Sequence, residues 1–123
     1  MSTESLAGAI VGHLVGDYLL QNDWMALHKK EKLWRCAIHV VLWYFAVLTF
    51  SGWGFTEVRH GFLLGQFLVV THFLQDHTDI VRRWMGWIGQ EKFATGPCSP
   101  WSIIVVDNVW HIVAIWVAWK WLV

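Results

Sequence analysis

The chain has 123 residues, which is short enough for a single domain covering residues 1–123. Hydrophobic residues make up 56% of it and charged residues only 15%, whereas soluble domains contain about 25% charged residues. This composition favours a membrane protein over a soluble one. The formal net charge is zero, so nothing indicates nucleic-acid binding, and we expect no nucleic-acid partner.

Four apolar stretches predict helices of roughly the 20 residues that a bilayer core requires. They cover residues 5–22, 33–52, 61–81 and 101–123. A basic loop (23–32), a short turn (53–60) and a longer loop (82–100) connect them, and Pro100 is placed to begin the last helix. The sequence therefore predicts an all-α, four-helix transmembrane bundle. The alternative is a small soluble helical bundle with an apolar surface.

The basic residues predict the orientation of this bundle. Seven of the nine lysines and arginines lie in or beside the first and third connections. Cytoplasmic loops are enriched in lysine and arginine, so these two connections are expected in the cytoplasm. Both termini are then expected on the non-cytoplasmic side. Tryptophan, of which the chain has 11 residues, occurs near both expected boundaries, where indole rings favour the membrane–water interface.

Three of the predicted helices each carry one histidine and one aspartate four residues apart. The pairs are His13/Asp17, His72/Asp76 and Asp107/His111. Four residues is close to one helical turn, so both members of a pair project from one face. Ionisable residues are costly within a membrane and normally face a shared interior, where they mark a functional site.

The depth of these residues is similar in all the helices. Counted from the expected cytoplasmic ends, the three aspartates and His39 lie about six residues inward, at a depth of ~9 Å. The three paired histidines lie about ten residues inward, at ~15 Å. The order also reverses as antiparallel helices require, since histidine precedes aspartate in two pairs and follows it in Asp107/His111. The sequence therefore predicts one buried site with two layers.

Three aspartates in a low-dielectric interior require compensating positive charge. Protonated histidines could supply it as ion pairs, or one or two divalent cations could bind among the side chains. Mixed nitrogen and oxygen ligands suit zinc, manganese or iron, and facing helices are a common source of such ligands. We favour a metal site because ion pairing alone does not explain the shared layers. The candidate ligands are His13, Asp17, His39, His72, Asp76, Asp107 and His111.

Two histidines are candidates for catalytic roles. His39 is either a further ligand or a general base. His77 adjoins Asp76 in the sequence but points about 100° away from it on a helix. It is therefore expected beside the ligands or at the cytoplasmic mouth of the site.

These residues resemble a family of small bacterial and bacteriophage membrane proteins classified as domain of unknown function 3307. The resemblance covers nearly the whole chain and is strongest over 13–26 (HLVGDYLLQNDWMA), followed by Lys29 and Lys30. It continues through His39, 72–76 (HFLQD) and 107–111 (DNVWH). His77 departs from it, since an aromatic residue is expected there. The resemblance implies a multi-pass protein of the bacterial inner membrane, and it extends distantly to membrane-bound, metal-dependent hydrolase-like proteins.

The resulting hypothesis is a membrane-embedded metal-dependent enzyme, a hydrolase acting from the cytoplasmic side. Its substrate would be a phosphoester or acyl compound of lipid-like or nucleotide-like structure. The alternatives are an ion or proton relay, a haem protein with histidine axial ligands, and a non-catalytic protein in which the His/Asp pairs hold the helices together. Membrane lipids are the expected partners, and the small size of the bundle makes a homo-oligomer plausible.

Overall fold

The computed structural model describes residues 3–52 and 58–122, and within these ranges the chain forms helices and no strand. The prediction of an all-α protein is therefore confirmed. The helices are α1 (Thr3–Val15), the π-helical segment η1 (Gly16–Leu20), α2 (Asp23–Ala26), α3 (Leu33–Ser51), α4 (Val58–His77), α5 (Ile80–Trp87), α6 (Glu91–Thr95) and α7 (Trp101–Trp121).

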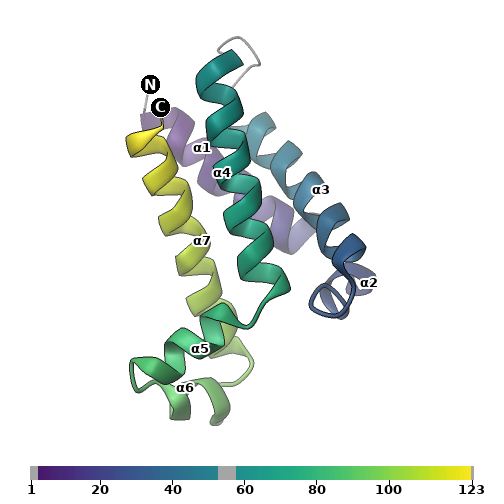
Figure 1. The fold of residues 1–123 in the computed structure, drawn as a ribbon, viewed down its shortest axis with the longest axis vertical. Coiled ribbons are helices and arrows are strands. Elements are labelled where there is room, and N and C mark those ends of the chain that lie inside the picture. The colour runs from purple at the N-terminus through teal and green to yellow at the C-terminus, as the bar shows by residue number, and fades with distance from the viewer. Residues whose placement is uncertain (1–2, 53–57, 123) are drawn as a thin grey trace.

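Four longer helices surround the interior of the molecule. Helix α1 packs on α3, α3 on α4, α4 on α7, and α7 on α1, which closes a ring of pairwise contacts. The start of α1 and the end of α7 lie together at one end of these helices, and α2, α5 and α6 lie at the other end (Figure 1). Side chains that face the centre of the ring can therefore meet although they are distant in the sequence.

The helix boundaries differ from the predicted ones in several places. The first predicted helix, 5–22, is α-helical only to Val15 and continues as a π-helix to Leu20. The third, predicted at 61–81, runs from Val58 to His77. The connections predicted as loops contain α2, α5 and α6, which are too short to give a clear periodic pattern. The turn predicted at 53–60 lies largely outside the described residues.

The start of α7 is as the sequence predicts. Its first residue is Trp101, and Pro100 is its N-cap, following a cis Ser99–Pro100 peptide bond. Helices α5 and α6 pack on α7 through a small apolar cluster of Val81, Met85 and Ala94. This cluster fixes α5 beside the first half of α7.

The close contact of α1 and η1 with α3 depends on glycines spaced one turn apart, Gly12 on α1 and Gly16 at the start of η1. At Gly12, an added Cβ would lie 2.7 Å from the carbonyl oxygen of Ala46 and 2.7 Å from Cα of Val47, both in the α3 backbone. At Gly16 it would lie 2.7 Å from Cδ1 of Trp43. Small residues let helix backbones approach in this way, and the approach places His13 and Asp17 directly against α3.

Candidate metal centre

Six of the predicted site residues converge inside the ring of helices. They are His13 from α1, Asp17 from η1, His39 from α3, His72 and Asp76 from α4, and His111 from α7. The four histidines and Asp76 are at most 2% exposed, and the Asp17 side chain is 10% exposed. The interior of this protein is therefore lined by imidazoles and carboxylates.

Two of the imidazoles, His39 and His72, lie close to both carboxylates, Asp17 and Asp76. His39 Nε2 lies 3.0 Å from Asp76 Oδ2, 3.1 Å from His72 Nε2 and 3.4 Å from Asp17 Oδ1. His72 Nε2 lies 3.4 Å from the same Asp76 oxygen and 3.6 Å from the same Asp17 oxygen. Ligands placed tetrahedrally around an ion at 2.0–2.1 Å are about 3.3 Å apart. We call these residues (Asp17, His39, His72 and Asp76) the four-donor set.

Three overlapping groups of the buried residues could each hold a metal ion. The groups are His13/Asp17/His111, Asp17/His39/His72 and His72/Asp76/His111. Any two of them share a residue, so two ions would require a bridging side chain. A carboxylate has two oxygens and can bridge, whereas a neutral imidazole offers one lone pair. Asp17 is the carboxylate that two of the groups share.

Several buried polar atoms at this site lack a hydrogen bond within the described part of the chain. They are Asp17 Oδ1, Asp76 Oδ2, His72 Nδ1 and His111 Nε2, whereas Asp76 Oδ1 has the Lys29 ammonium at 2.8 Å. Buried polar atoms nearly always have a hydrogen-bond partner, and leaving one without a partner costs about 1–3 kcal/mol. Such a concentration of unsatisfied acceptors around one point is the pattern expected of a cation site.

Neighbouring groups fix the orientation of two imidazoles. His111 Nδ1 donates to the carbonyl oxygen of Asp107 at 2.8 Å, which leaves Nε2 as the nitrogen with a free lone pair. In contrast, both ring nitrogens of His13 are occupied. Trp43 Nε1 donates to His13 Nδ1 at 3.0 Å, and His13 Nε2 donates to Asn108 Oδ1 at 3.1 Å.

Lys29 reaches the site from the segment between α2 and α3. Its Nζ lies 2.8 Å from Asp76 Oδ1, and its side chain is 19% exposed. Burial alone would lower the pKa of Lys29, but the Asp76 carboxylate outweighs this effect and raises it. Lys29 therefore supplies one permanent positive charge to the site.

The other two predicted site residues lie outside the three groups. Asp107 Oδ2 is 3.7 Å from His111 Nδ1, but its side chain is 24% exposed and lines an adjacent cavity. His77 Nδ1 donates to the carbonyl oxygen of Lys29 at 2.7 Å. The structure thus places His77 where it positions the Lys29 segment.

Sequence reasoning missed the part played by Trp43. Besides its hydrogen bond to His13, its ring stacks on that of His72 with centroids 3.9 Å apart. A signal was present, because Trp43 follows His39 by one helical turn and lies in mid-helix, away from the interfaces that indoles favour. The ion pair between Lys29 and Asp76 was also missed, since a loop lysine gives no sequence signal for such a contact.

Fold and site together define an all-helical protein with buried histidine and aspartate groups that could hold a metal ion. Residues 6–123 match the model of the family described as Protein of unknown function (DUF3307). The chain belongs to this family, which confirms the resemblance that the sequence motifs indicated. No curated protein and no solved structure matches the chain.

Proposed function

We propose that the protein is a membrane-embedded, metal-dependent hydrolase whose four-donor set binds one divalent ion. The observation that carries this proposal is the position of two buried imidazole nitrogens, His39 Nε2 and His72 Nε2, which lie 3.1 Å from each other and 3.0–3.6 Å from one oxygen each of Asp17 and Asp76. Mixed nitrogen and oxygen donors suit zinc, manganese or iron. Because His13 already uses both ring nitrogens, we propose a single ion.

The distribution of polar and apolar side chains supports a membrane environment. Helices α3 and α7 are long and apolar enough to cross a membrane. Only 33% of the apolar stretch of α3 and 22% of that of α7 is buried inside the protein. The core helix of a soluble protein would be mostly buried. Large apolar side chains such as Phe45, Phe62 and Val109 are instead about half exposed or more, while the histidines are buried. Apolar exposure of this extent marks an interaction surface.

The proposed topology is the one that the charges predict. Helices α3, α4 and α7 have 19, 20 and 21 residues, so each is about 29–32 Å long and matches the hydrocarbon core. We place α1 with η1 as the fourth span of a bundle in the bacterial inner membrane. The end with α2, α5 and α6 carries most of the basic residues and is cytoplasmic in this arrangement.

A substrate could approach from this end through a polar cavity of about 350 Å³. Asp76 and Asp107 line this cavity together with Lys29, Lys30 and Arg82. It reaches the surface, because the side chains of Lys30 and Asp79 in its wall are 52% and 59% exposed. The site is therefore buried from the apolar surface but accessible from the basic end.

The bound ion would supply a polarised water and an electrophile for a phosphoester or acyl bond. Asp107 lines the same cavity as Asp76 and lies beside His111, so its Oδ2 would be the carboxylate oxygen available to hold a proton there. Lys29 holds Asp76 in position and provides positive charge where negative charge develops in the transition state. Trp43 holds the His13 and His72 rings in place on the apolar side.

A second candidate function, a non-catalytic protein or a proton relay, rests on the position of His39. Its Nε2 lies between Asp76 and Asp17, at 3.0 Å and 3.4 Å from their oxygens. A proton on His39 would form ion pairs with both carboxylates without a metal. The two candidates therefore differ in what neutralises the same two aspartates, and a metal analysis separates them.

The test is elemental analysis by plasma mass spectrometry of the detergent-purified protein after reconstitution with zinc, manganese or ferrous iron. We expect about one equivalent of metal in the wild type and loss of it in the Asp17→Asn/Asp76→Asn variant. Asp79→Asn is the matched control, since this carboxylate is exposed and lies outside the four-donor set, and it should retain the metal. Folded wild-type protein that binds none of the three metals would refute the proposal and favour the ion-pair function.

The catalytic part is tested with the Asp107→Asn variant on phosphoester and carboxylic ester substrates. This variant should retain the metal, because Asp107 lies outside the three groups. Its turnover should fall by roughly 10²–10⁴-fold, the usual contribution of a general base. Equal turnover in the variant and the wild type would exclude Asp107 from the reaction.

A further inference from the structure

The polar cavity adjoins a second cavity of different character. This apolar groove has a volume of about 600 Å³ and is formed by α4, α5 and α7. Gln75 lines both cavities. On α5, Arg82 lines the polar cavity and Trp84 lines the groove. On α7, Ile104 lines the polar cavity and Val105 lines the groove. One ligand could therefore occupy both spaces at once.

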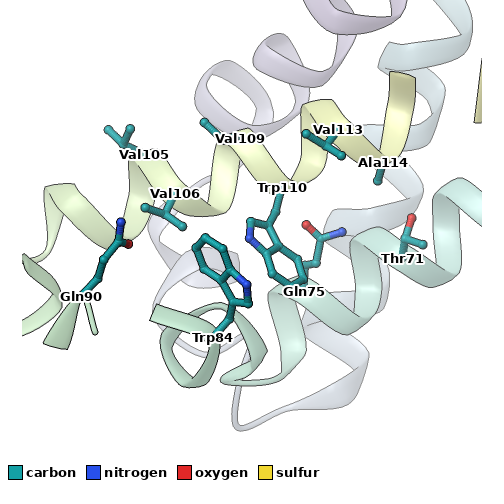
Figure 2. A pocket seen from close by; sticks show the side chains of 10 residues that line it. All are labelled: Thr71, Gln75, Trp84, Gln90, Val105, Val106, Val109, Trp110, Val113 and Ala114. Atoms are coloured by element: carbon teal, nitrogen blue, oxygen red, sulfur yellow. The ribbon is translucent and has the colours of Figure 1, made fainter. Parts of the chain in front are cut away.

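The groove is built to receive an apolar chain. Figure 2 shows valines of α7 along one wall, with Gln75 and Thr71 of α4 opposite, Trp84 and Trp110 in the middle, and Gln90 at one end. From Val105 to Ala114 the wall spans nine residue steps, or about 14 Å along the helix. This length is close to half of the ~30 Å hydrocarbon core, which is one leaflet. Val105, Val109 and Val113 are each more than half exposed, so the groove opens to the side.

The charge of the polar cavity changes when a metal binds. Three cations (Lys29, Lys30 and Arg82) and three carboxylates (Asp76, Asp79 and Asp107) line it. Lys30 Nζ is paired with Asp79 Oδ1 at 2.7 Å, whereas Arg82 has no ion pair within the described ranges. A divalent ion on Asp76 would make the cavity positive. This positive charge rests on the proposed function, since it comes from the bound metal ion. It predicts that the cavity accepts an anion.

We propose that the ligand of the site is an anionic phospholipid. Its phosphate occupies the polar cavity near Arg82 and Lys29, and one acyl chain lies in the apolar groove along α7. A nucleotide would explain the cations but would leave the groove unexplained, because the groove has only Thr71, Gln75 and Gln90 among its polar or hydrogen-bonding side chains besides the two indoles. An acyl chain alone would leave Arg82 unpaired.

The arrangement also agrees with the proposed membrane topology. The polar cavity lies at the basic end of the helices, where the lipid headgroups of the cytoplasmic leaflet would lie. The groove runs from there along α7 toward the middle of the bilayer. A lipid could therefore enter sideways from its own leaflet without leaving the hydrocarbon core.

The test is native mass spectrometry of the zinc-loaded, full-length protein with phosphatidic acid and with phosphatidylcholine of the same acyl chains. We expect phosphatidic acid to bind at least about tenfold more tightly, as a charge-assisted hydrogen bond predicts. Glycerol 3-phosphate, which has the phosphate without the chains, should compete only weakly. Equal binding of the two lipids, or equal competition by glycerol 3-phosphate, would overturn the proposal.

Two pairs of variants localise the binding. Arg82→Gln removes a cation of the polar cavity, and Arg83→Gln is its control, because Arg83 is also exposed but does not line the cavity. Val109→Trp fills the groove, and Val41→Trp on α3 is its control, since both valines are 52% exposed. The first member of each pair should weaken phosphatidic acid binding by about tenfold, and the controls should leave it unchanged.

The same spectra separate this proposal from the proposed function, because bound zinc adds to the mass. Protein that holds zinc but shows no preference for phosphatidic acid would refute the lipid site and leave the metal site standing. Protein that holds no zinc would refute the metal site, whatever lipid it binds. If Arg82→Gln and Val109→Trp bind phosphatidic acid like their controls, the lipid lies elsewhere and the proposed site is wrong.

Discussion

Replacing Gly12 with alanine should weaken both the fold and the metal site. The added Cβ would lie 2.7 Å from two backbone atoms of α3, about 0.7 Å closer than an ordinary contact of 3.4 Å. Because helix backbone atoms cannot move singly, α1 as a whole must shift away from α3. Overpacking of this kind costs about 1–3 kcal/mol of the free energy of unfolding. The shift would also carry Asp17, on η1, away from His39.

The assay is reversible unfolding in mixed micelles, combined with a zinc titration. Gly86→Ala on α5 is the matched control, since an added Cβ there meets nothing within 4 Å, and alanine in a helix is favoured over glycine. We expect Gly86→Ala to be at least as stable as the wild type and to bind zinc normally. If Gly12→Ala were equally stable and bound zinc with unchanged affinity, close packing of α1 on α3 would not be what positions the site.

Three further predictions concern the metal, a hydrogen bond and a surface charge. Removal of metal with a chelator should lower the free energy of unfolding by about 2.7 kcal/mol relative to protein at a free ion concentration of a hundred times Kd, and unchanged stability would argue against a bound ion. Trp43→Phe should cost about 1–3 kcal/mol in the same unfolding assay, because it leaves His13 Nδ1 without its donor; no change would mean that His13 finds another partner. The hydrogen bond from Lys30 lowers the pKa of Asp79, so this exposed pair stabilises the fold above the unfolded pKa of the carboxyl and loses its small effect as the pH falls through the native pKa. In Lys30→Ala the NMR titration midpoint of Asp79 should rise, and an unmoved midpoint would contradict this assignment.

The geometry within each His/Asp pair could be predicted from the sequence. The members approach to 3.5 Å in His13/Asp17, 3.4 Å in His72/Asp76 and 3.7 Å in the third pair. A separation of four residues on a helix determines this distance almost by itself. The all-α class followed from the apolar stretches for a similar reason, since their length and composition leave few alternatives.

The exclusion of Asp107 from the three metal groups depends on chain direction. Side chains on a helix lean toward its N-terminus. Helices α1 and α4 run toward the end with α2 and α5. Their side chains therefore lean away from that end, which brings Asp17 and Asp76 toward the interior. Helix α7 runs the other way, so Asp107 leans toward the polar cavity. The equal depths deduced from residue counts did not include this difference.

Contacts made by loop residues could not be predicted in the same way. Lys29 belongs to a connection without periodicity, and its ion pair with Asp76 exists because the segment after α2 folds back against the end of α4. The π-helical turn at Gly16–Leu20 likewise has no sequence signal in a single chain. Such turns occur frequently at functional sites, and this one carries Asp17.

The charges of the site connect the metal with the proposed lipid. Asp17 and Asp76 contribute two negative charges to a buried region, and Lys29 contributes one positive charge. A proton on His39 would make this group neutral, and Arg82 would then be the cation of the polar cavity without an ion pair in the described part of the chain. A divalent ion would instead leave one positive charge beside the polar cavity, which a phosphate could neutralise. Buried charges are costly unless they are paired, so a metal-loaded site requires an anionic ligand in a way that a protonated site does not.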